Sequence, residues 1–218
     1  MSRMEPVVRR ATMEDAPRIL EVLERALARD PFVAWLSRGR ESARRSYFGL
    51  MLRRIALPKG IVHVGLVGSE IACAALWAPP GTFVLTPGES LLLMPTMIRV
   101  IGVRRFASVA AILEDVERAR PPEPRWLLTL LGTVPEHRRR GLASATLAPA
   151  LARCDADGVP AVCETSDPAN LAFYARHGFE VTNERRLGEG GPPSWTLERA
   201  PRGGEPDAPA SRAHRTSV

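Results

Sequence analysis

The chain has 218 residues, of which 45% are hydrophobic and 25% are charged, a balance typical of a globular domain with a sizeable core. Its formal net charge of +6 comes from scattered arginines, and aromatic residues make up only 6%. A nucleic-acid interface needs a concentrated basic face or aromatic stacking platforms, so no nucleic-acid partner is expected. The longest apolar region, residues 91–103, contains Pro95 and Arg99 and is too short to span a membrane.

The cysteines and histidines point to a reducing compartment without a metal site. Cys73, Cys154 and Cys163 lie in apolar contexts without C-x-x-C spacing, which predicts buried free thiols. The four histidines have no metal-ligand spacing. The N-terminal region has no apolar signal segment, so the sequence predicts a cytoplasmic protein.

The first half of the chain alternates strand and helix patterns. Residues 12–15 resemble a capping box ahead of a one-sided apolar helix, and Asp30-Pro31 ends that helix. Gly68-Ser69 is a two-residue hairpin turn. The patterns predict strands over 7–10, 61–67 and 70–78, and helices over about 42–56, 89–103 and 104–119.

The second half continues the alternation. A helix is expected over 141–157, and Pro149 inside it should bend or interrupt it, because an interior proline removes a backbone hydrogen bond. Strands are expected over 127–134, 160–164, 179–187 and 194–199. Residues 200–218 consist of Pro, Gly, Ala and charged residues without a period, which predicts a disordered tail after a single domain, residues 1–199.

The stretch LLTLLGTVPEHRRRGLA, residues 127–143, joins an apolar strand to a basic turn and a helix N-terminus. Its apolar residues form too continuous a run for a strand with one solvent-exposed face. A central strand that is buried on both faces of the sheet is therefore expected. Pro135 ends the strand, and Gly141 allows a tight turn. Free N–H groups at a helix N-terminus favour an anion such as a phosphate, and three consecutive arginines, 138–140, add charge. Neither a Walker loop nor a Rossmann fingerprint is present.

A second strand-to-helix junction follows the apolar run PAVCE, residues 160–164. Ser166 or Asp167 can cap a helix that has Pro168 at its first position. This helix carries an asparagine, a tyrosine four residues later and a Gly-Phe exit, namely Asn170, Tyr174 and Gly178-Phe179.

Together these motifs resemble those of the GNAT superfamily, the acyl-CoA-dependent N-acetyltransferases. Arg138-x-x-Gly141-x-Ala143 is similar to the Gln/Arg-x-x-Gly-x-Gly/Ala signature, and the Asn170–Tyr174 pair to the other hallmark. The runs EPRWLLTLLG, ETS…N…FY…HGF and GPPSWTLER look most like those of the puromycin N-acetyltransferases and their relatives. The resemblance is dense from Pro121 to Arg199 and implies an α/β fold with a mixed central sheet flanked by helices.

The resemblance also implies acetyl-CoA as co-substrate and assigns site residues. The pantetheine arm would bond to the strand backbone at Leu131, Gly132, Thr133 and Val134. The diphosphate would lie against the turn and the next helix, at Arg138, Arg139, Arg140, Gly141, Leu142, Ala143 and Ser144. Asn170 would hydrogen-bond the cofactor. Tyr174 would donate a proton to the departing thiolate, because a phenol with a pKa of about 10 is protonated at neutral pH.

The general base is not evident from the sequence. The strand over 127–134 has no Asp, Glu or His, unlike family members that place a carboxylate there. Glu164, at the end of the following strand, is the preferred base, acting through water, with Asp30 and His63 as alternatives. Glu164 could equally be a structural acceptor for an amide or an arginine.

The implied function is acetyl transfer to a primary amine of a small molecule, antibiotic-like or metabolite, by a monomer or homodimer. The acceptor pocket is expected around Asp30, Phe32, Trp35 and Tyr47 and under the insertion 88–120. One alternative is acetylation of a protein or peptide amine, which an open acidic groove would favour. Another is a non-catalytic acyl-CoA-binding regulator, which the missing strand carboxylate would favour.

Overall fold

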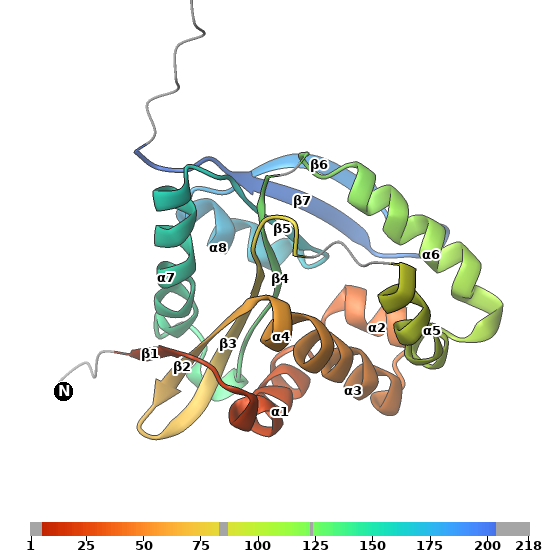
Figure 1. Ribbon diagram of the computed structural model, residues 1–218, viewed down its shortest axis with the longest axis horizontal. Helices are drawn as coiled ribbons and strands as arrows, with labels where there is room; N and C mark the ends of the chain where they lie inside the picture. The colour runs from red at the N-terminus through yellow and green to blue at the C-terminus, as the bar shows by residue number, and fades with distance from the viewer. Residues whose placement is uncertain (1–5, 83–86, 123, 204–218) are drawn as a thin grey trace, which may run out of the picture.

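The computed structural model describes residues 6–82, 87–122 and 124–203, and its centre is a seven-stranded sheet of order β1-β2-β3-β4-β5-β7-β6 (Figure 1). β4 and β5 are parallel, and all other neighbours are antiparallel. The strands are β1 Val7–Arg10, β2 Ile61–Val67, β3 Glu70–Ala78, β4 Trp126–Thr133, β5 Ala161–Thr165, β6 Glu180–Arg186 and β7 Pro193–Arg199. This mixed sheet with flanking helices confirms the predicted fold class. Most of the predicted tail, residues 204–218, lies outside the described residues.

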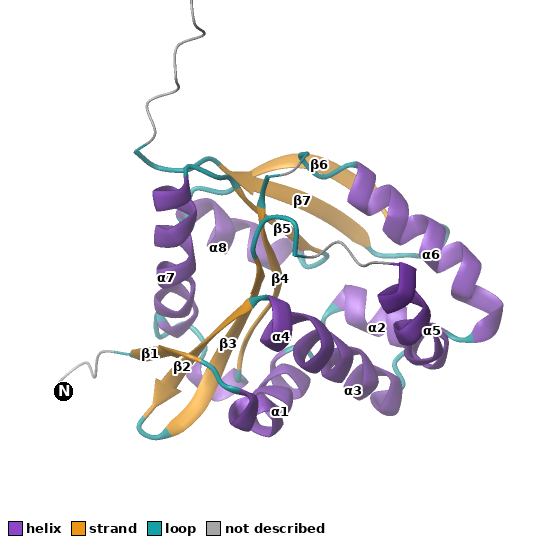
Figure 2. Cartoon of the chain, viewed as in Figure 1, coloured by secondary structure: helices purple, strands orange, loops and turns teal. Residues whose placement is uncertain are grey.

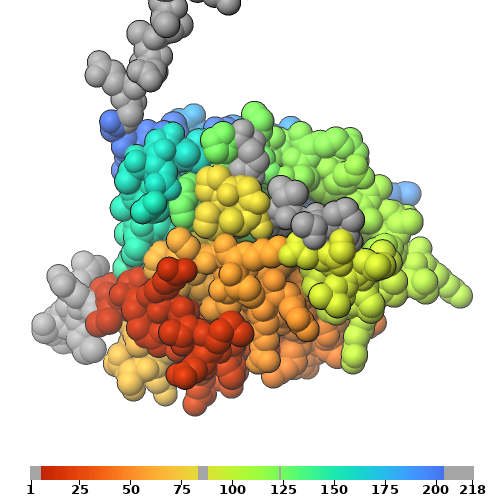
Figure 3. All heavy atoms as spheres, in the orientation of Figure 1, coloured from red at the N-terminus to blue at the C-terminus, as the bar shows by residue number. Residues whose placement is uncertain are grey.

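Helices cover both faces of the sheet (Figure 2). On one face lie α1 Ala16–Ala26, α2 Pro31–Ser37, α3 Glu41–Leu50 with its π-helical continuation Met51–Ala56, and α4 Leu57–Lys59. On the other lie α7 Leu142–Asp157 and α8 Leu171–Arg176. The insertion forms α5 Pro87–Ile101 and α6 Val103–Arg118, and Figure 3 shows it packed beside the α3 region. Short 3-10 turns occupy Met13–Asp15, Pro135–His137 and Pro168–Asn170.

The first helix follows directly from its sequence pattern. The Thr12 N–H donates to the Asp15 carboxylate at 2.8 Å, which is part of the expected capping box. Ile19 and Leu23 lie on the buried face of α1 with no exposed surface. Burial of this apolar face against β3 and β4 fixes the helix over the sheet.

The expected interruption at Pro149 does not occur. α7 runs unbroken from Leu142 to Asp157 with Pro149 inside it. Pro149 lies at an exposed position of the helix, where its ring does not disturb the packed face. α5 likewise contains Pro95 at an exposed position.

Other sequence expectations concern thiols and membranes. Cys73, Cys154 and Cys163 are buried free thiols, as predicted. Of the helices in the described ranges, none has the length and apolar character that crossing a membrane requires.

Candidate active site

The site begins where β4 and β5 part. The two strands are in register only from Trp126 opposite Ala161 to Leu128 opposite Cys163, yet β4 continues to Thr133. The other edge of β4 remains paired with β3. A bulge at Thr129 accompanies the divergence, and its Oγ1 donates to the Leu76 carbonyl oxygen at 3.0 Å. In the described strands, the edge of β4 beyond Leu128 is therefore open toward β5.

The direction of the β4 backbone groups decides which residues face this gap. The Val134 N–H donates to the Ala72 carbonyl oxygen at 3.0 Å, so Val134 turns toward β3. Backbone groups alternate in direction along an antiparallel ladder, so Gly132 also turns toward β3, whereas Leu131 and Thr133 face the gap. Of the four strand residues assigned to the pantetheine arm, Leu131 and Thr133 therefore direct their backbone groups into the gap, and Gly132 and Val134 direct theirs to β3.

Gly132 has a packing role instead. A Cβ atom at this position would lie 2.8 Å from the Cβ of Ala26, so the missing side chain allows α1 to approach β4 closely. The sequence did not predict this packing contact, because it joins residues more than a hundred positions apart.

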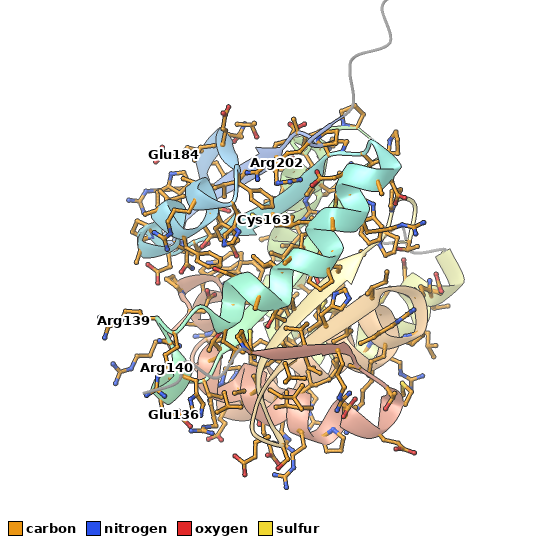
Figure 4. The ribbon with its side chains drawn as sticks, turned by 90° about the vertical axis from the view of Figure 1, so that its left-hand side faces the viewer. Glu136, Arg139, Arg140, Cys163, Glu184 and Arg202 are labelled. Carbon is orange, nitrogen blue, oxygen red and sulfur yellow. The ribbon has the colours of Figure 1, made fainter. Side chains whose placement is uncertain are left out.

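The basic turn after β4 has the shape of an anion site. Arg139 and Gly141 have φ angles of +60° and +83°. The first hydrogen bond of α7 runs from the Ala145 N–H to the Gly141 carbonyl oxygen at 3.0 Å, so the N–H groups of residues 142–144 precede the helical ladder. Arg139 and Arg140 project outward beside them (Figure 4). Amides at the positive end of a helix, flanked by two guanidinium groups, suit a diphosphate.

Arg138 and Ser144, the outer residues of the predicted diphosphate site, already have side-chain partners. The Arg138 guanidinium donates to the carbonyl oxygens of Thr133, at 3.1 Å from Nε, and Ala26, at 2.6 Å from Nη2. It therefore fastens the end of β4 to the C-terminus of α1. The Ser144 hydroxyl lies 3.0 Å from Nε2 of His177. The backbone N–H of Ser144 remains at the start of the helix, where it can contribute to the anion site.

A cavity of about 1080 Å³ opens at the gap between β4 and β5. α2, α3, α5 and α6 form its wall, which is mostly aliphatic and aromatic, and the strands form its floor. The predicted acceptor residues Asp30, Phe32 and Tyr47 line it. Trp35 is not among the lining residues but packs against Phe32, with ring centroids 6.1 Å apart.

Tyr174 enters the same cavity from α8. Its ring packs edge-on against Phe173 and Phe179, with centroids 5.3 and 5.7 Å away. Burial, and then the neighbouring Cys163 and Asp30 side chains, raise the pKa of the Tyr174 phenol well above its ordinary value. The phenol is therefore protonated at neutral pH and able to donate.

Asn170, on the turn between β5 and α8, also lines the cavity. Its Nδ2 donates to Oγ1 of Thr165 at 3.1 Å. Asp167 caps the same turn, because Oδ1 accepts the Ala169 N–H at 3.0 Å. These bonds hold the asparagine and the tyrosine on one short segment.

Glu164 is bound by an arginine. Its Oε1 and Oε2 accept from Nε and Nη2 of Arg120 at 3.3 and 2.8 Å. Glu117, near the end of α6, pairs with both Arg120 and Arg125. Burial disfavours the charged form of Arg120, but Glu164 and then Glu117 outweigh it and keep the pKa of Arg120 above its ordinary value. Of the two roles left open for Glu164, the geometry provides the arginine acceptor.

The alternative bases occupy different sides of the sheet. Asp30 lines the cavity and caps α2, where its Oδ1 accepts the Val33 N–H at 2.9 Å. His63 lies on β2 two residues before Gly65, whose Cβ position faces Leu142 and Thr146 of α7. Residues two apart on a strand share a face, so His63 is on the α7 side and not in the cavity lining. His63 is therefore excluded as a base acting in the cavity.

Comparison with known proteins identifies this architecture. Residues 126–182, which run from β4 into β6, match the family model described as Acetyltransferase (GNAT) domain. An acetyltransferase from Corynebacterium glutamicum, described as "histone acetyltransferase HPA2 and related acetyltransferase", has 24% identity and a TM-score of 0.70, with 94% of this chain and 100% of that chain covered. The fold is that of the GNAT acetyltransferases.

Two further GNAT-like structures are enzymes named for small amines. The polyamine N-acetyltransferase of Drosophila melanogaster is 17% identical with a TM-score of 0.65, covering 90% of this chain and 100% of that one. Arylalkylamine N-acetyltransferase 2 of Aedes aegypti is 10% identical with a TM-score of 0.65, covering 90% and 99%. The matched GNAT segment and the shared fold indicate an acetyl-CoA-dependent N-acetyltransferase.

Sequence reasoning did not identify Arg120 as part of the site. It stands 44 positions before Glu164, at the end of an amphipathic helix, where an arginine is most often a solvated residue. The available signal was a basic residue beside the stiff Pro121-Pro122 segment that leads into β4.

Proposed function

We propose that this protein transfers the acetyl group of acetyl-CoA to a primary amine of a small molecule. The open edge of β4 carries the proposal, because it leads from the cavity to the amide-lined turn before α7. An extended chain with amide groups can bond to a free strand edge as an additional strand does. A carrier with a pantetheine arm and a diphosphate has both of the required parts.

The cofactor contacts follow from the backbone directions. We propose that Leu131 and Thr133 bond to the arm, that residues 138–144 hold the diphosphate, and that Asn170 adds a side-chain contact. Arg139 and Arg140 supply charge, whereas Arg138 shapes the turn through its bonds to Thr133 and Ala26. This arrangement places the thioester end of the carrier at the cavity.

The proposed chemistry is direct transfer between two bound substrates. The neutral amine attacks the thioester carbonyl carbon, forming the C–N bond, and the C–S bond breaks with its electron pair going to sulfur. A cavity carboxylate, Glu164 or Asp30, takes the proton that the amine loses, and Tyr174 gives its proton to the thiolate. Holding both substrates in one cavity supplies much of the rate.

The shape of the cavity supports a small acceptor. Helices α5 and α6 wall it, rather than leaving the open acidic groove that a peptide substrate would need. Its volume of about 1080 Å³ suits an acceptor as large as an antibiotic, consistent with the likeness to puromycin N-acetyltransferases. We propose a cytoplasmic monomer or homodimer without a nucleic-acid or membrane partner, which agrees with the buried free thiols.

The proposal is tested with an amine panel and acetyl-CoA, following release of free thiol, together with calorimetry of CoA binding. We expect heat on CoA addition and thiol release with at least one small primary amine. Heat without release to any amine or peptide would favour a non-catalytic regulator. Release only with peptides would favour the peptide alternative, and absence of heat would refute the assignment.

A further inference from the structure

We infer that Asp30 receives the amine of the acceptor as general base, and that the acceptor is a monoamine with an apolar body. This inference rests on the proposed function and specifies its acceptor side. It combines two observations, the ion pairing of the carboxylates that line the cavity and the chemical character of the remaining wall.

Among the described residues, four carboxylates line the cavity, namely Asp30, Glu114, Glu117 and Glu164. Glu164 is held by Arg120, and Glu117 by Arg120 and Arg125. Glu114 lies 3.8 Å from the Arg118 guanidinium. Among the cavity-lining residues that the structure describes, Asp30 is therefore the carboxylate without a guanidinium partner. An incoming ammonium group meets an uncompensated negative charge only there.

Asp30 is fixed in position and close to the proposed acid. As the N-cap of α2 it accepts the Val33 N–H and interacts with the Phe32 N–H, and the two carboxylate oxygens keep further lone pairs for an amine. Its charge contributes to the raised pKa values of both Tyr47 and Tyr174, so it lies within electrostatic range of both phenols. Burial raises the pKa of Asp30 itself, which strengthens it as a proton acceptor.

The rest of the wall specifies the acceptor body. The insertion contributes mainly large apolar side chains to the cavity, namely Leu93, Met94, Met97, Ile101, Phe106 and Leu113. A second ammonium on the acceptor would be desolvated among these groups without a free carboxylate, which is costly. The wall therefore favours an aryl- or alkyl-monoamine over a diamine or polyamine.

The proton balance is simple. The acceptor enters as an ammonium, and one N–H proton passes to the Asp30 carboxylate, which becomes neutral. The free amine then attacks the thioester carbonyl. Asp30, having returned the first proton to solvent, accepts the second N–H proton, which leaves the product amide neutral. Tyr174 protonates the departing thiolate and regains its proton from solvent.

The test compares the wild type with Asp30→Asn, using 2-phenylethylamine and hexylamine against putrescine, spermidine and agmatine. Asparagine can still cap α2, so the variant retains the fold. We expect kcat/KM for 2-phenylethylamine to exceed that for each polyamine, and Asp30→Asn to lower it about a hundredfold with CoA affinity unchanged. Asp115→Asn, on the outer side of α6 beside Arg118, is the matched control and keeps wild-type rates.

The pH profile separates a base from a structural residue. A base works deprotonated, so activity falls as the pH drops through the raised pKa of Asp30, and this acid limb lies above the ordinary aspartate range. Besides burial, Asp167 beside α8 raises the pKa of Asp30, whereas the Val33 and Phe32 N–H groups lower it. The phenols of Tyr47 and Tyr174 respond to the charge of Asp30 in turn. We expect the limb to vanish in Asp30→Asn and to persist in Glu164→Gln.

Each outcome bears on a specific claim. An acid limb that survives in Asp30→Asn, or disappears in Glu164→Gln, would overturn Asp30 as the base. A higher kcat/KM for spermidine or agmatine than for the monoamines would overturn the monoamine acceptor while leaving the proposed acetyl transfer intact. No thiol release with any amine would refute both the inference and the proposed function.

Discussion

Aromatic contacts, in addition to the turn that begins α8, determine the position of Tyr174. Phe173 and Phe179 contact its ring edge-on from two directions, and Gly178 turns the chain between α8 and Phe179. Such edge-to-face pairs fix the ring plane and leave the hydroxyl at the cavity end of the side chain. The hydroxyl group can therefore be removed without disturbing the packing that holds the ring.

Tyr174→Phe is expected to lower kcat about tenfold or more while leaving the Kd for CoA unchanged, because only the proton donor is lost. Single-turnover kinetics and calorimetry measure the two quantities. A matched control is Phe173→Leu, which alters ring packing but keeps the hydroxyl. A Tyr174→Phe enzyme with wild-type kcat would remove the phenol from the mechanism.

Residue pairs far apart in sequence account for what the sequence could not predict at this scale. The residue types of the site were accessible from motifs, because Asn170, Tyr174 and Gly141 sit at strand-to-helix junctions with recognisable capping residues. The Arg120–Glu164 pair and the isolated charge of Asp30 depend on how α6 and α2 pack over the sheet. Local periodicity carries no information on that packing.

Among the elements, the turn before α7 combines a left-handed backbone conformation with free amide groups that suit a diphosphate. Gly141 has a left-handed backbone, and a Cβ there would meet no atom within 4 Å. Any cost of substitution therefore comes from backbone conformation rather than from a steric clash. Gly158 has the same property at the opposite end of the helix, with φ of +65°.

Gly141→Ala is expected to destabilise the protein by about 1 kcal/mol and to weaken CoA binding severalfold, because relief of the strain moves the amides of residues 142–144. Gly158→Ala provides the matched control, with a similar loss of stability and unchanged CoA affinity. Urea unfolding and calorimetry give both values. Equal CoA affinities in the two variants would show that the turn does not hold the diphosphate.

Sequence patterns predicted the elements themselves well and their irregularities poorly. The strands around Gly68-Ser69 and the two junctions after β4 and β5 were expected within a few residues. The π-helical turn over Met51–Ala56, the bulge at Thr129 and the unbroken course of α7 through Pro149 were not. These features arise from tertiary packing and from solvent exposure, which a single sequence does not reveal.

For the whole molecule, one buried ion pair ties the C-terminal strand to the helical layer. Arg199 of β7 has an exposed fraction of 3% and donates to both Asp155 oxygens, at 2.7 and 2.8 Å, near the end of α7. Its Nε also donates to the His177 carbonyl oxygen at the end of α8. The hydrogen bond from Arg199 is the main reason that the pKa of Asp155 is lowered.

Asp155→Asn is expected to reduce the free energy of unfolding at pH 7 by about 2 to 3 kcal/mol, because a charged bond to a buried guanidinium is lost. The folded-state pKa of Asp155 lies below its unfolded value of about 3.9, so this stabilisation is present above that value and is lost as the pH falls through the folded pKa. Thermal unfolding of both proteins from pH 7 to pH 3 measures it.

Glu21→Gln is the control for that experiment, because Glu21 pairs with Arg18 on the exposed side of α1, where ion pairs contribute little. We expect its melting temperature to follow the wild type across the pH range. A difference between Asp155→Asn and the wild type that stays constant down to pH 3 would contradict an electrostatic origin.

The short register between β4 and β5 has a consequence for how a substrate reaches the interior. Beyond Leu128 and Cys163, the described parts of these two strands have no paired residues between them, so spreading them breaks no interstrand bonds. We therefore expect that a long, narrow molecule can enter between β4 and β5, in the plane of the sheet, while the paired parts of the sheet on either side keep their hydrogen bonds. Entry and exit are then expected to require side-chain rearrangement rather than partial unfolding.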